Sequence, residues 1–205
     1  MNWPGNLLLP ICIYYYNYTG RMNQQQLIKE CKEGSAAAQK WLFDHFADKM
    51  IMVCRRYVKQ EADAEELMLD GFFKFFKNIS SFQYQGEAPL FSWIKRIMIN
   101  ECLMFLRKKN AFVITAETTE EQFPVRADIL DKLNAEEIFK LIIRLPVGYR
   151  TVFNLYAIEG MGHKEIAQLM NITEGTSKSQ LSKARQYLQK MLIHKNNDYA
   201  NRKAN

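Results

Sequence analysis

The feature that most constrains the fold of this chain is the recurrence of apolar residues every three or four positions. Between residues 35 and 57 the series is Leu42, Phe46, Met50, Val53 and Tyr57. That spacing is the period of an α-helix with one buried side. The 205 residues include only 9 Gly and 5 Pro. We therefore expect an all-α protein, long enough for one large or two small domains, each with its own core.

Two stretches lack this period and divide the chain. Residues 1–21 are apolar, but they contain Pro10, are too short to span a bilayer and lack the features of a signal peptide. We interpret them as a poorly ordered extension, with Met22 as an alternative start. Residues 111–132 carry several acids in an otherwise basic chain, which is typical of a linker. The expected domains are residues 23–110 and 133–193, followed by a tail at 194–205.

The first domain contains an acidic segment at the start of a predicted helix. Asp63 and Glu66 are three residues apart, the spacing of a capping box with Asp63 as the cap. Capping does not need four carboxylates, yet Glu65 and Asp70 are also present. Phe73 falls outside the apolar stripe of the same helix. Two interpretations stay open: a well-capped helix start, or a surface for a protein partner.

An aromatic, polar loop and a basic helix follow. The loop ends at Pro89, which suits the first position of a helix. Aromatic rings can stack on bases, amides can bond base edges and cations can contact phosphates. Trp93 alone is more often a core residue than a ring that stacks on bases, so the prediction of a site for single-stranded DNA depends on the whole cluster. Its members are Phe82, Gln83, Tyr84, Phe91, Trp93, Lys95, Arg96 and Asn100.

The second domain ends in the layout of a helix-turn-helix. A predicted helix at 163–170 is followed by a short connection and by a second helix from Glu174 to about Leu192. The second helix has an apolar side that includes Leu181 and Ala184. Short polar and cationic groups cover its other side, as a helix in the major groove requires. These groups are Lys178, Ser179, Ser182, Lys183, Arg185 and Gln186. Solvated lysines on an ordinary surface helix would explain the charges but not the preceding motif.

Nothing in the sequence has the pattern of a catalytic or metal site. A phosphate loop and a carboxylate pair with a histidine are missing, and the cysteines and histidines have no metal-ligand spacing. These are Cys12, Cys31, Cys54, Cys102, His45, His163 and His194. We expect no enzyme activity, cofactor, metal or small-molecule substrate. Three of the cysteines fall on apolar stripes, so we expect buried thiols and a cytoplasmic location. The net charge of +6 favours a polyanionic partner.

Several segments, taken in order, resemble one family. They are 63–67 (DAEEL), 91–97 (FSWIKRI) with Asn100, 106–109 (LRKK), 145–150 (LPVGYR), 159–160 (EG), 165–167 (EIA) and 174–185 (EGTSKSQLSKAR). This order is similar to that of extracytoplasmic-function (ECF) sigma factors of bacterial RNA polymerase, which have sigma domains 2 and 4 only. The resemblance covers about residues 23–192. Met104, Ser177, Gln180 and Ser182 depart from residues common in the family.

The resemblance implies a role for each segment. Residues 23–110 would bind the clamp helices of core RNA polymerase and melt the promoter −10 element, with the loop from Phe82 to Pro89 capturing a flipped base. Residues 133–193 would contact the polymerase flap and read the −35 element through Lys178, Ser179, Ser182, Lys183, Arg185 and Gln186. The clamp contacts would be Asp63, Glu65, Glu66, Asp70 and Phe73. Promoter DNA and an anti-sigma factor are the other implied partners.

One alternative from another class stays open at this point. A stand-alone helix-turn-helix regulator would bind DNA as a dimer and use residues 23–110 for dimerisation or sensing. The chain shows no heptad seam, and the acidic, aromatic and basic order of its first domain does not resemble a dimer interface. DNA binding without initiation by core RNA polymerase would favour this alternative.

Overall fold

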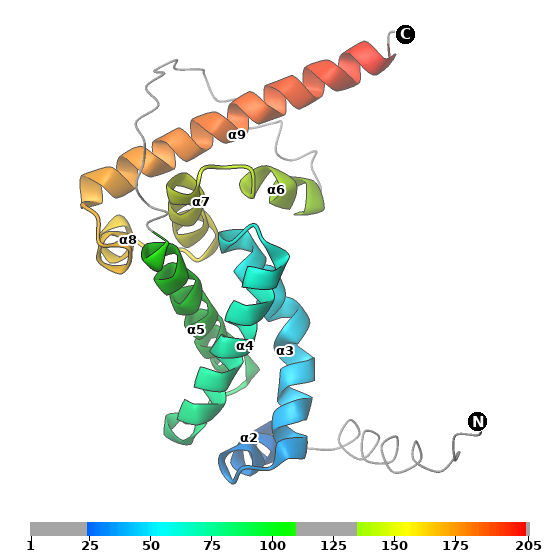
Figure 1. The fold of residues 1–205 in the computed structure, drawn as a ribbon, viewed down its shortest axis with the longest axis vertical. Helices are drawn as coiled ribbons and strands as arrows, with labels where there is room; N and C mark the ends of the chain where they lie inside the picture. Colours follow the sequence, from blue (N-terminus) through cyan, green and yellow to red (C-terminus); the bar gives the residue numbers. More distant parts are fainter. Residues whose placement is uncertain (1–23, 110–134, 204–205) are drawn as a thin grey trace, which may run out of the picture.

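The computed structural model describes residues 24–109 and 135–203, and this part of the chain is helical without a strand (Figure 1). The predicted all-α class is confirmed. The expected extension at 1–21, the linker at 111–132 and Cys12 lie outside the described residues. None of the helices in the described parts is both long and apolar enough to cross a bilayer.

The first half is a bundle of three long helices with a short helix at one end (Figure 1). Its elements are α2 (Gln24–Lys32), α3 (Ala36–Tyr57), α4 (Glu61–Asn78), the short 3-10 turn η1 (Ile79–Ser81) and α5 (Glu87–Lys108). Each pair among α3, α4 and α5 is in contact, and α2 packs on α3. The bundle thus presents one face of each long helix to the core and the other to solvent.

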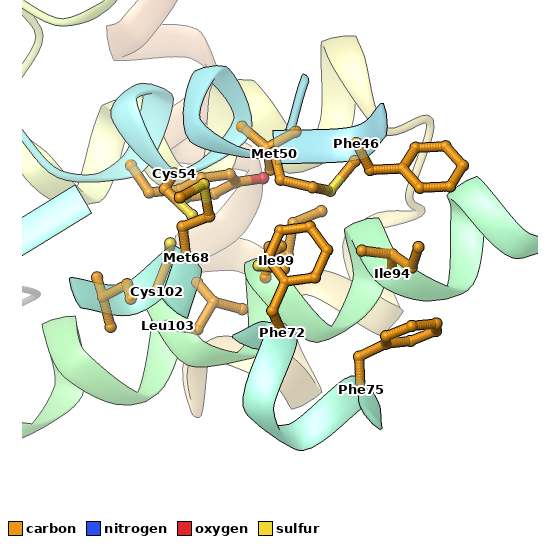
Figure 2. Packing of buried hydrophobic residues seen from close by; sticks show 14 of the residues in the cluster. Phe46, Met50, Cys54, Met68, Phe72, Phe75, Ile94, Ile99, Cys102 and Leu103 are labelled. Carbon is orange, nitrogen blue, oxygen red and sulfur yellow. The ribbon is translucent and has the colours of Figure 1, made fainter. Parts of the chain in front are cut away.

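The core forms where the apolar sides of α3, α4 and α5 meet. Figure 2 shows Phe46 and Met50 of α3 near Phe72 of α4 and Ile94 of α5. All four side chains are at most 2% exposed. The five apolar residues predicted for the buried side of α3 are all buried as well. The helical period alone therefore identified the side of α3 that packs.

The start of α3 follows from two adjacent residues. Gly34 has a φ of 85°, a left-handed conformation that ends α2 without the clash of a side chain. Ser35 then caps α3, because its hydroxyl accepts a hydrogen bond from the Ala38 amide at 3.4 Å. Gly34 and Ser35 thus separate the end of α2 from the start of α3.

Two other predicted helix starts are wrong. α4 begins at Glu61 with Gln60 at the cap position, so Asp63 lies within the first turn and is not the cap. The backbone is extended at Gln60 (φ −76°, ψ 127°), and the helix starts at the next residue, two positions before Asp63. Likewise α5 begins at Glu87, which makes Pro89 its third residue rather than its first. Proline is tolerated there because the first amides of a helix have no intrahelical acceptor.

The second half is built around one long helix. Its elements are α6 (Ala135–Ile142), α7 (Val147–Phe153), the π-helical turn η3 (Asn154–Ile158), α8 (His163–Met170) and α9 (Glu174–Lys203). α6, α7 and α8 all pack against α9, which crosses one end of the molecule (Figure 1). The predicted helix-turn-helix corresponds to α8 and α9, although α9 continues past the expected end near Leu192.

The two halves touch each other. α3 contacts α7, and α5 contacts α8. One apolar cluster includes the core of the first half together with Val152, Leu155, Ile166, Met170 and Leu181 from the second half. The expectation of two separate small cores is therefore incomplete. One apolar cluster crosses the contact, and a second, smaller cluster of Leu145, Tyr149 and Ala184 lies within the second half.

Candidate polymerase and nucleic-acid interfaces

The exposed side of α4 combines acids with uncovered apolar side chains. Glu65, Glu66 and Asp70 are exposed, and Phe73 is 69% exposed. Leu69, which sequence reasoning missed, is 55% exposed between them. We call these five residues the α4 surface. Phe72 and Phe75 point into the core, so the helical step of about 100° per residue turns Phe73 outward.

Asp63 differs from the other acids predicted for this surface. Its carboxylate is 3.2 Å from the ammonium of Lys109, at the end of α5. The Asp63 side chain is also 26% exposed, against 56% for that of Lys109. The pair therefore ties the start of α4 to the end of α5, and Asp63 is less accessible than Glu65, Glu66 and Asp70.

The loop after η1 is anchored by a pair of stacked rings. Phe82 lies parallel to Trp93 of α5, with ring centroids 4.8 Å apart and an angle of 2° between the planes. Trp93 also meets the edge of Phe75 at 5.0 Å. Both rings of the stacked pair are half-buried. They thus form a continuous aromatic block with one side accessible at the surface.

Hydrogen bonds fix the same loop to α2. The Lys32 ammonium donates to the Phe82 carbonyl at 2.6 Å, and the Tyr84 hydroxyl donates to the Gln24 side chain. Gln24 also donates to Glu87 at 3.0 Å. This bond, with a further one to His45, lowers the pKa of the Glu87 carboxyl. Burial, reinforced by the charge of Glu87, raises the pKa of Tyr84. These hydrogen bonds therefore tie the loop to α2.

A hollow of about 420 Å³ lies between α2 and this loop. Its lining includes the predicted residue Tyr84 and the exposed cations of Lys29 and Lys32. Sequence reasoning missed both lysines because they belong to α2, far from the loop along the chain. Gln83 is exposed on the same loop. Two cations beside an aromatic loop suit a phosphate and an unstacked base.

The basic side of α5 is engaged by the second half of the molecule. The Lys95 ammonium lies 2.6 Å from a carboxylate oxygen of Glu159, and 5.8 Å from the centroid of the half-buried Phe91 ring. Arg96 lies 3.7 Å from Glu165 of α8. Asn100, on the same helix, is exposed. The structure thus brings the predicted α5 residues together, with two of their cations paired to acids.

The turn between α8 and α9 has well-defined local causes. Asn171 ends α8 with a φ of 55°, a left-handed conformation that asparagine tolerates better than most residues. Thr173 then accepts a hydrogen bond from the Thr176 amide at 3.0 Å, as an N-cap does. His163 and Ser177 form a 2.9 Å hydrogen bond that joins the start of α8 to α9. Ser177 is buried, so its departure from the family pattern is explained by this contact.

The predicted DNA-facing side of α9 is accessible. Leu181 and Ala184 are buried beneath it, at 4% and 0% exposed. Lys178 forms an ion pair of 2.9 Å with Glu174, and Arg185 lies 5.8 Å from the centre of the Tyr156 ring. The exposed members are Lys178, Ser179, Ser182, Lys183 and Arg185, with Gln186 half-buried. A cationic and hydroxyl-bearing face on a fixed apolar base can enter a groove of DNA.

The parts of the chain that the structure describes contain no group of three or more histidine, cysteine or acidic residues able to hold a metal ion. Cys31, Cys54 and Cys102 are free thiols, all buried. The candidate sites described above consist of charged, amide and aromatic side chains.

Comparison with known proteins gives matches in both halves. The model of Sigma-70 region 2 matches residues 42–112, and that of Sigma-70, region 4 matches residues 135–188, together more than half of the chain. The ECF RNA polymerase sigma factor SigW of Bacillus subtilis is 29% identical over 178 residues, which cover 80% of this chain and 94% of that protein. The ECF RNA polymerase sigma-E factor of Haemophilus influenzae is 24% identical over 184 residues, covering 82% and 95%.

Solved structures similar to the chain include two protein complexes. The sigma factor RpoE in complex with the anti-sigma factor NepR from Bartonella quintana has a TM-score of 0.47 and 21% identity, and the match covers 75% of this chain and 96% of that one. CnrH in complex with the cytosolic domain of CnrY has a TM-score of 0.45 and 19% identity, covering 83% and 97%.

The fold and these sites define a helical protein of the transcription class, with a helix-turn-helix at its C-terminal side and an acidic, partly apolar exposed surface on α4. The two family models and the curated relatives identify it further: the chain belongs to the ECF sigma factors. It is a sigma factor that directs promoter-specific transcription, and a stand-alone dimeric regulator is not favoured.

Proposed function

We propose that this sigma factor binds core RNA polymerase through the α4 surface and contacts the promoter at two separate places. The observation that carries the proposal is the 69% exposure of Phe73 among acids on a helix whose other aromatic residues are buried or half-buried. A large apolar ring left in water is typical of a protein interface, where aromatic residues supply much of the binding energy. Glu65, Glu66 and Asp70 would add charge complementarity to a basic partner such as the clamp helices.

The −10 contact would use the loop after η1 and the adjacent side of α5. Phe82 and Trp93 form a rigid aromatic block on which an unpaired base can stack. Extruding a base costs a few kcal/mol, so a preformed ring stack and the nearby hollow would offset part of that cost. The remaining contacts would come from Gln83, Tyr84, Phe91, Lys95, Arg96 and Asn100.

The −35 contact would use α9 in the major groove. Lys178, Lys183 and Arg185 would contact phosphates, while Ser179, Ser182 and Gln186 would face base edges. We assign residues 23–110 to sigma domain 2 and residues 133–193 to sigma domain 4. Two modest DNA contacts on one chain bind more tightly together than either does alone. The flap of the polymerase would hold the second domain.

The protein would act in the cytoplasm and contribute no chemistry of its own, because the polymerase forms the bonds. An anti-sigma factor is a further partner expected from the family, and it would cover the α4 surface or the DNA-binding surfaces. RpoE of Bartonella quintana, a distant relative by sequence, was solved with such a partner.

Run-off transcription with core RNA polymerase tests the proposal. We expect the protein to start transcription from its own promoters, and we expect Glu66→Ala and Lys183→Ala to weaken initiation at least tenfold. Glu136→Ala and Lys140→Ala are matched controls, because both residues form an exposed ion pair of 2.6 Å on α6. DNA binding without any initiation would contradict the proposal.

A further inference from the structure

A line of hydrogen bonds connects the loop after η1 to three helices of the first half. The Tyr84 hydroxyl donates to the side-chain oxygen of Gln24 on α2, and the Gln24 amide nitrogen donates to one carboxylate oxygen of Glu87 on α5 at 3.0 Å. The other oxygen of Glu87 lies 3.3 Å from Nε2 of His45 on α3. We call these four residues the polar bridge. Each member comes from a different element, so the bridge ties the loop to α2, α3 and α5 together.

The direction of each hydrogen bond in the polar bridge follows from the chemistry of its members. The bonds from Gln24 and His45 lower the pKa of the Glu87 carboxyl, so this group is ionised at neutral pH and can only accept. His45 therefore donates from Nε2. The Gln24 amide turns its nitrogen toward Glu87 and its oxygen toward Tyr84. One amide thus links a hydroxyl donor to a carboxylate acceptor.

Aromatic contacts hold the far end of the polar bridge. The His45 ring stacks on Trp41, with centroids 4.9 Å apart and an angle of 8° between the planes. It also meets the edge of Phe46 at 4.7 Å, and Phe46 is 2% exposed. The polar bridge therefore extends from a ring packed on the bundle core to the loop at the surface.

The backbone between Tyr84 and Glu87 supports the same arrangement. Gly86 has a φ of 117° and a ψ of 174°, a conformation that is essentially confined to glycine. It joins the loop to α5, so that Glu87 is the first residue of that helix. An acid at this position is favoured by the positive end of the helix dipole. The sequence Gly86-Glu87 thus places the carboxylate where the polar bridge needs it.

Only one member of the polar bridge lines the hollow between α2 and the loop. The Tyr84 side chain lines it beside Lys29 and Lys32, whereas Gln24, Glu87 and His45 are outside its lining. Those three can therefore influence a bound base through Tyr84. Ordering a loop on binding lowers affinity, and a loop that is already held in place avoids this cost.

We propose that Gln24, Glu87 and His45 are positioning residues for the −10 contact, which hold the Tyr84 ring at the hollow before an unpaired base enters and do not touch the base themselves. The inference rests on the proposed function in assigning the loop to an unpaired base. One hydrogen bond between exposed groups contributes little, so the effect comes from the connected set.

Exchanging the amide and the carboxylate of the polar bridge tests this inference. Glu87→Gln gives position 87 a single oxygen for two donors, and Gln24→Glu places two carboxylates against each other. The double variant has the carboxylate at position 24 and the amide at position 87. Every donor then faces an acceptor again, and the net charge equals that of the wild type. Glu136→Gln is the control for Glu87→Gln, because Glu136 forms an exposed ion pair with Lys140 on α6, outside the polar bridge.

The measured quantity is the preference of the holoenzyme for forked promoter DNA with an unpaired −10 strand over the same promoter as a full duplex. The holoenzyme is core polymerase with the full-length protein, on a promoter from which the wild type initiates. We expect each single variant to lower this preference by about 3–10-fold, and the double variant to return it to within about twofold of the wild type. Glu136→Gln should leave it unchanged. Thermal unfolding should be the same in all variants, because Gln24, Glu87 and His45 are exposed.

Charge alone predicts a different result. Removing an acid beside DNA with Glu87→Gln would strengthen binding, whereas loss of the polar bridge weakens it. An unchanged or stronger preference in Glu87→Gln would overturn the inference, and so would a double variant as weak as the single ones. Either result leaves the proposed function intact, provided that the wild-type holoenzyme prefers forked DNA. A wild-type holoenzyme without this preference would overturn the proposed −10 contact and the inference with it.

Discussion

The guanidinium of Arg150 lies in the interior and donates to the main-chain carbonyl of Tyr57 at 2.7 Å. Its other acceptors are the carbonyls of Ile143 and Leu145, each at 3.1 Å. Arg150 is 1% exposed, and burial lowers its pKa to about 10. The side chain therefore remains a cation at neutral pH, and carbonyl dipoles rather than a carboxylate hold it in place.

We expect Arg150→Ala to lower the free energy of unfolding by about 3 kcal/mol, because three carbonyls, two of them in buried hydrogen bonds, would lose this donor and a cavity would remain. Arg150→Lys should recover less than half of that loss, since one ammonium cannot reach the carbonyls that a planar guanidinium spans. Urea unfolding followed by circular dichroism measures both. Arg144→Ala, at an exposed position of the same half, should change stability by less than about 0.5 kcal/mol. An unchanged free energy of unfolding in Arg150→Ala would contradict the assigned role.

Phe73 provides a test of the α4 surface that is separate from folding. Phe73→Ala removes a ring that is 69% exposed, so its thermal unfolding should match that of the wild type. Affinity for core polymerase should fall by about 2 kcal/mol, or roughly thirtyfold, as for an aromatic residue at the centre of an interface. Biolayer interferometry with immobilised core polymerase measures this. Met104→Ala is the control, because Met104 is 43% exposed on another helix. An equal loss of affinity for core polymerase in Phe73→Ala and Met104→Ala would count against the α4 surface as the binding site.

Trp93 provides a test of base capture. Trp93→Ala removes the ring on which Phe82 stacks, and base stacking contributes about 1–3 kcal/mol per base. We expect roughly 5–150-fold less open complex, measured by permanganate reactivity of unpaired thymines in the −10 region. Trp93→Phe should retain most of the reactivity because it keeps an aromatic face. Normal melting by a folded Trp93→Ala protein would exclude this role.

Lys183 provides a test of the −35 contact. If it binds one phosphate, Lys183→Ala should reduce the slope of log affinity against log salt by about 0.9. The loss of affinity should be similar for duplexes of different sequence, because phosphates carry no sequence information. Ser182→Ala, in contrast, should affect only duplexes that contain the cognate −35 sequence. An unchanged slope for Lys183→Ala would place Lys183 away from the DNA backbone.

Local patterns in the sequence predicted much of the fold. Leu42, Phe46 and Met50 are buried because a helical period depends only on neighbours along the chain. The helix-turn-helix could be predicted for the same reason, since Asn171 and Thr173 act within one turn. The outward position of Phe73 likewise follows from the angular step of the helix. Such features require no knowledge of the tertiary structure.

Contacts distant along the chain could not be predicted in this way. Lys95 and Glu159 form an ion pair of 2.6 Å across the two halves, and no periodicity links their positions. The same holds for Lys32, which reaches the Phe82 carbonyl from another helix. Asp63 was mistaken for a cap because the cap position depends on where the preceding chain turns. Residue types and spacing predict candidate functional groups, but not which of them meet.

The buried thiols give a final test with a defined pH dependence. Burial, together with the charge of Glu30, raises the pKa of Cys31 to about 12 from an ordinary value of 9.0. A hydrogen bond with Cys54 and burial raise the pKa of Cys102 as well. Because the thiolate is the nucleophile, iodoacetamide at about pH 8 should modify these cysteines far more slowly in the native protein than in urea. A Cys12→Ser background removes the remaining thiol from the assay.

Cys31 should also affect stability at alkaline pH. Its thiol loses a proton near its ordinary pKa of 9.0 in the unfolded chain but only at about 12 in the folded protein. Between these two pKa values the unfolded state binds fewer protons than the folded state, so the free energy of unfolding should fall as pH rises. At lower pH the Cys31 thiol is protonated in both states and should not change the free energy of unfolding with pH. Cys31→Ala should have a flatter profile when urea unfolding is measured from about pH 8 to pH 10.5. Identical slopes in the two proteins would show that the Cys31 thiol ionises as readily in the folded state as in the unfolded chain.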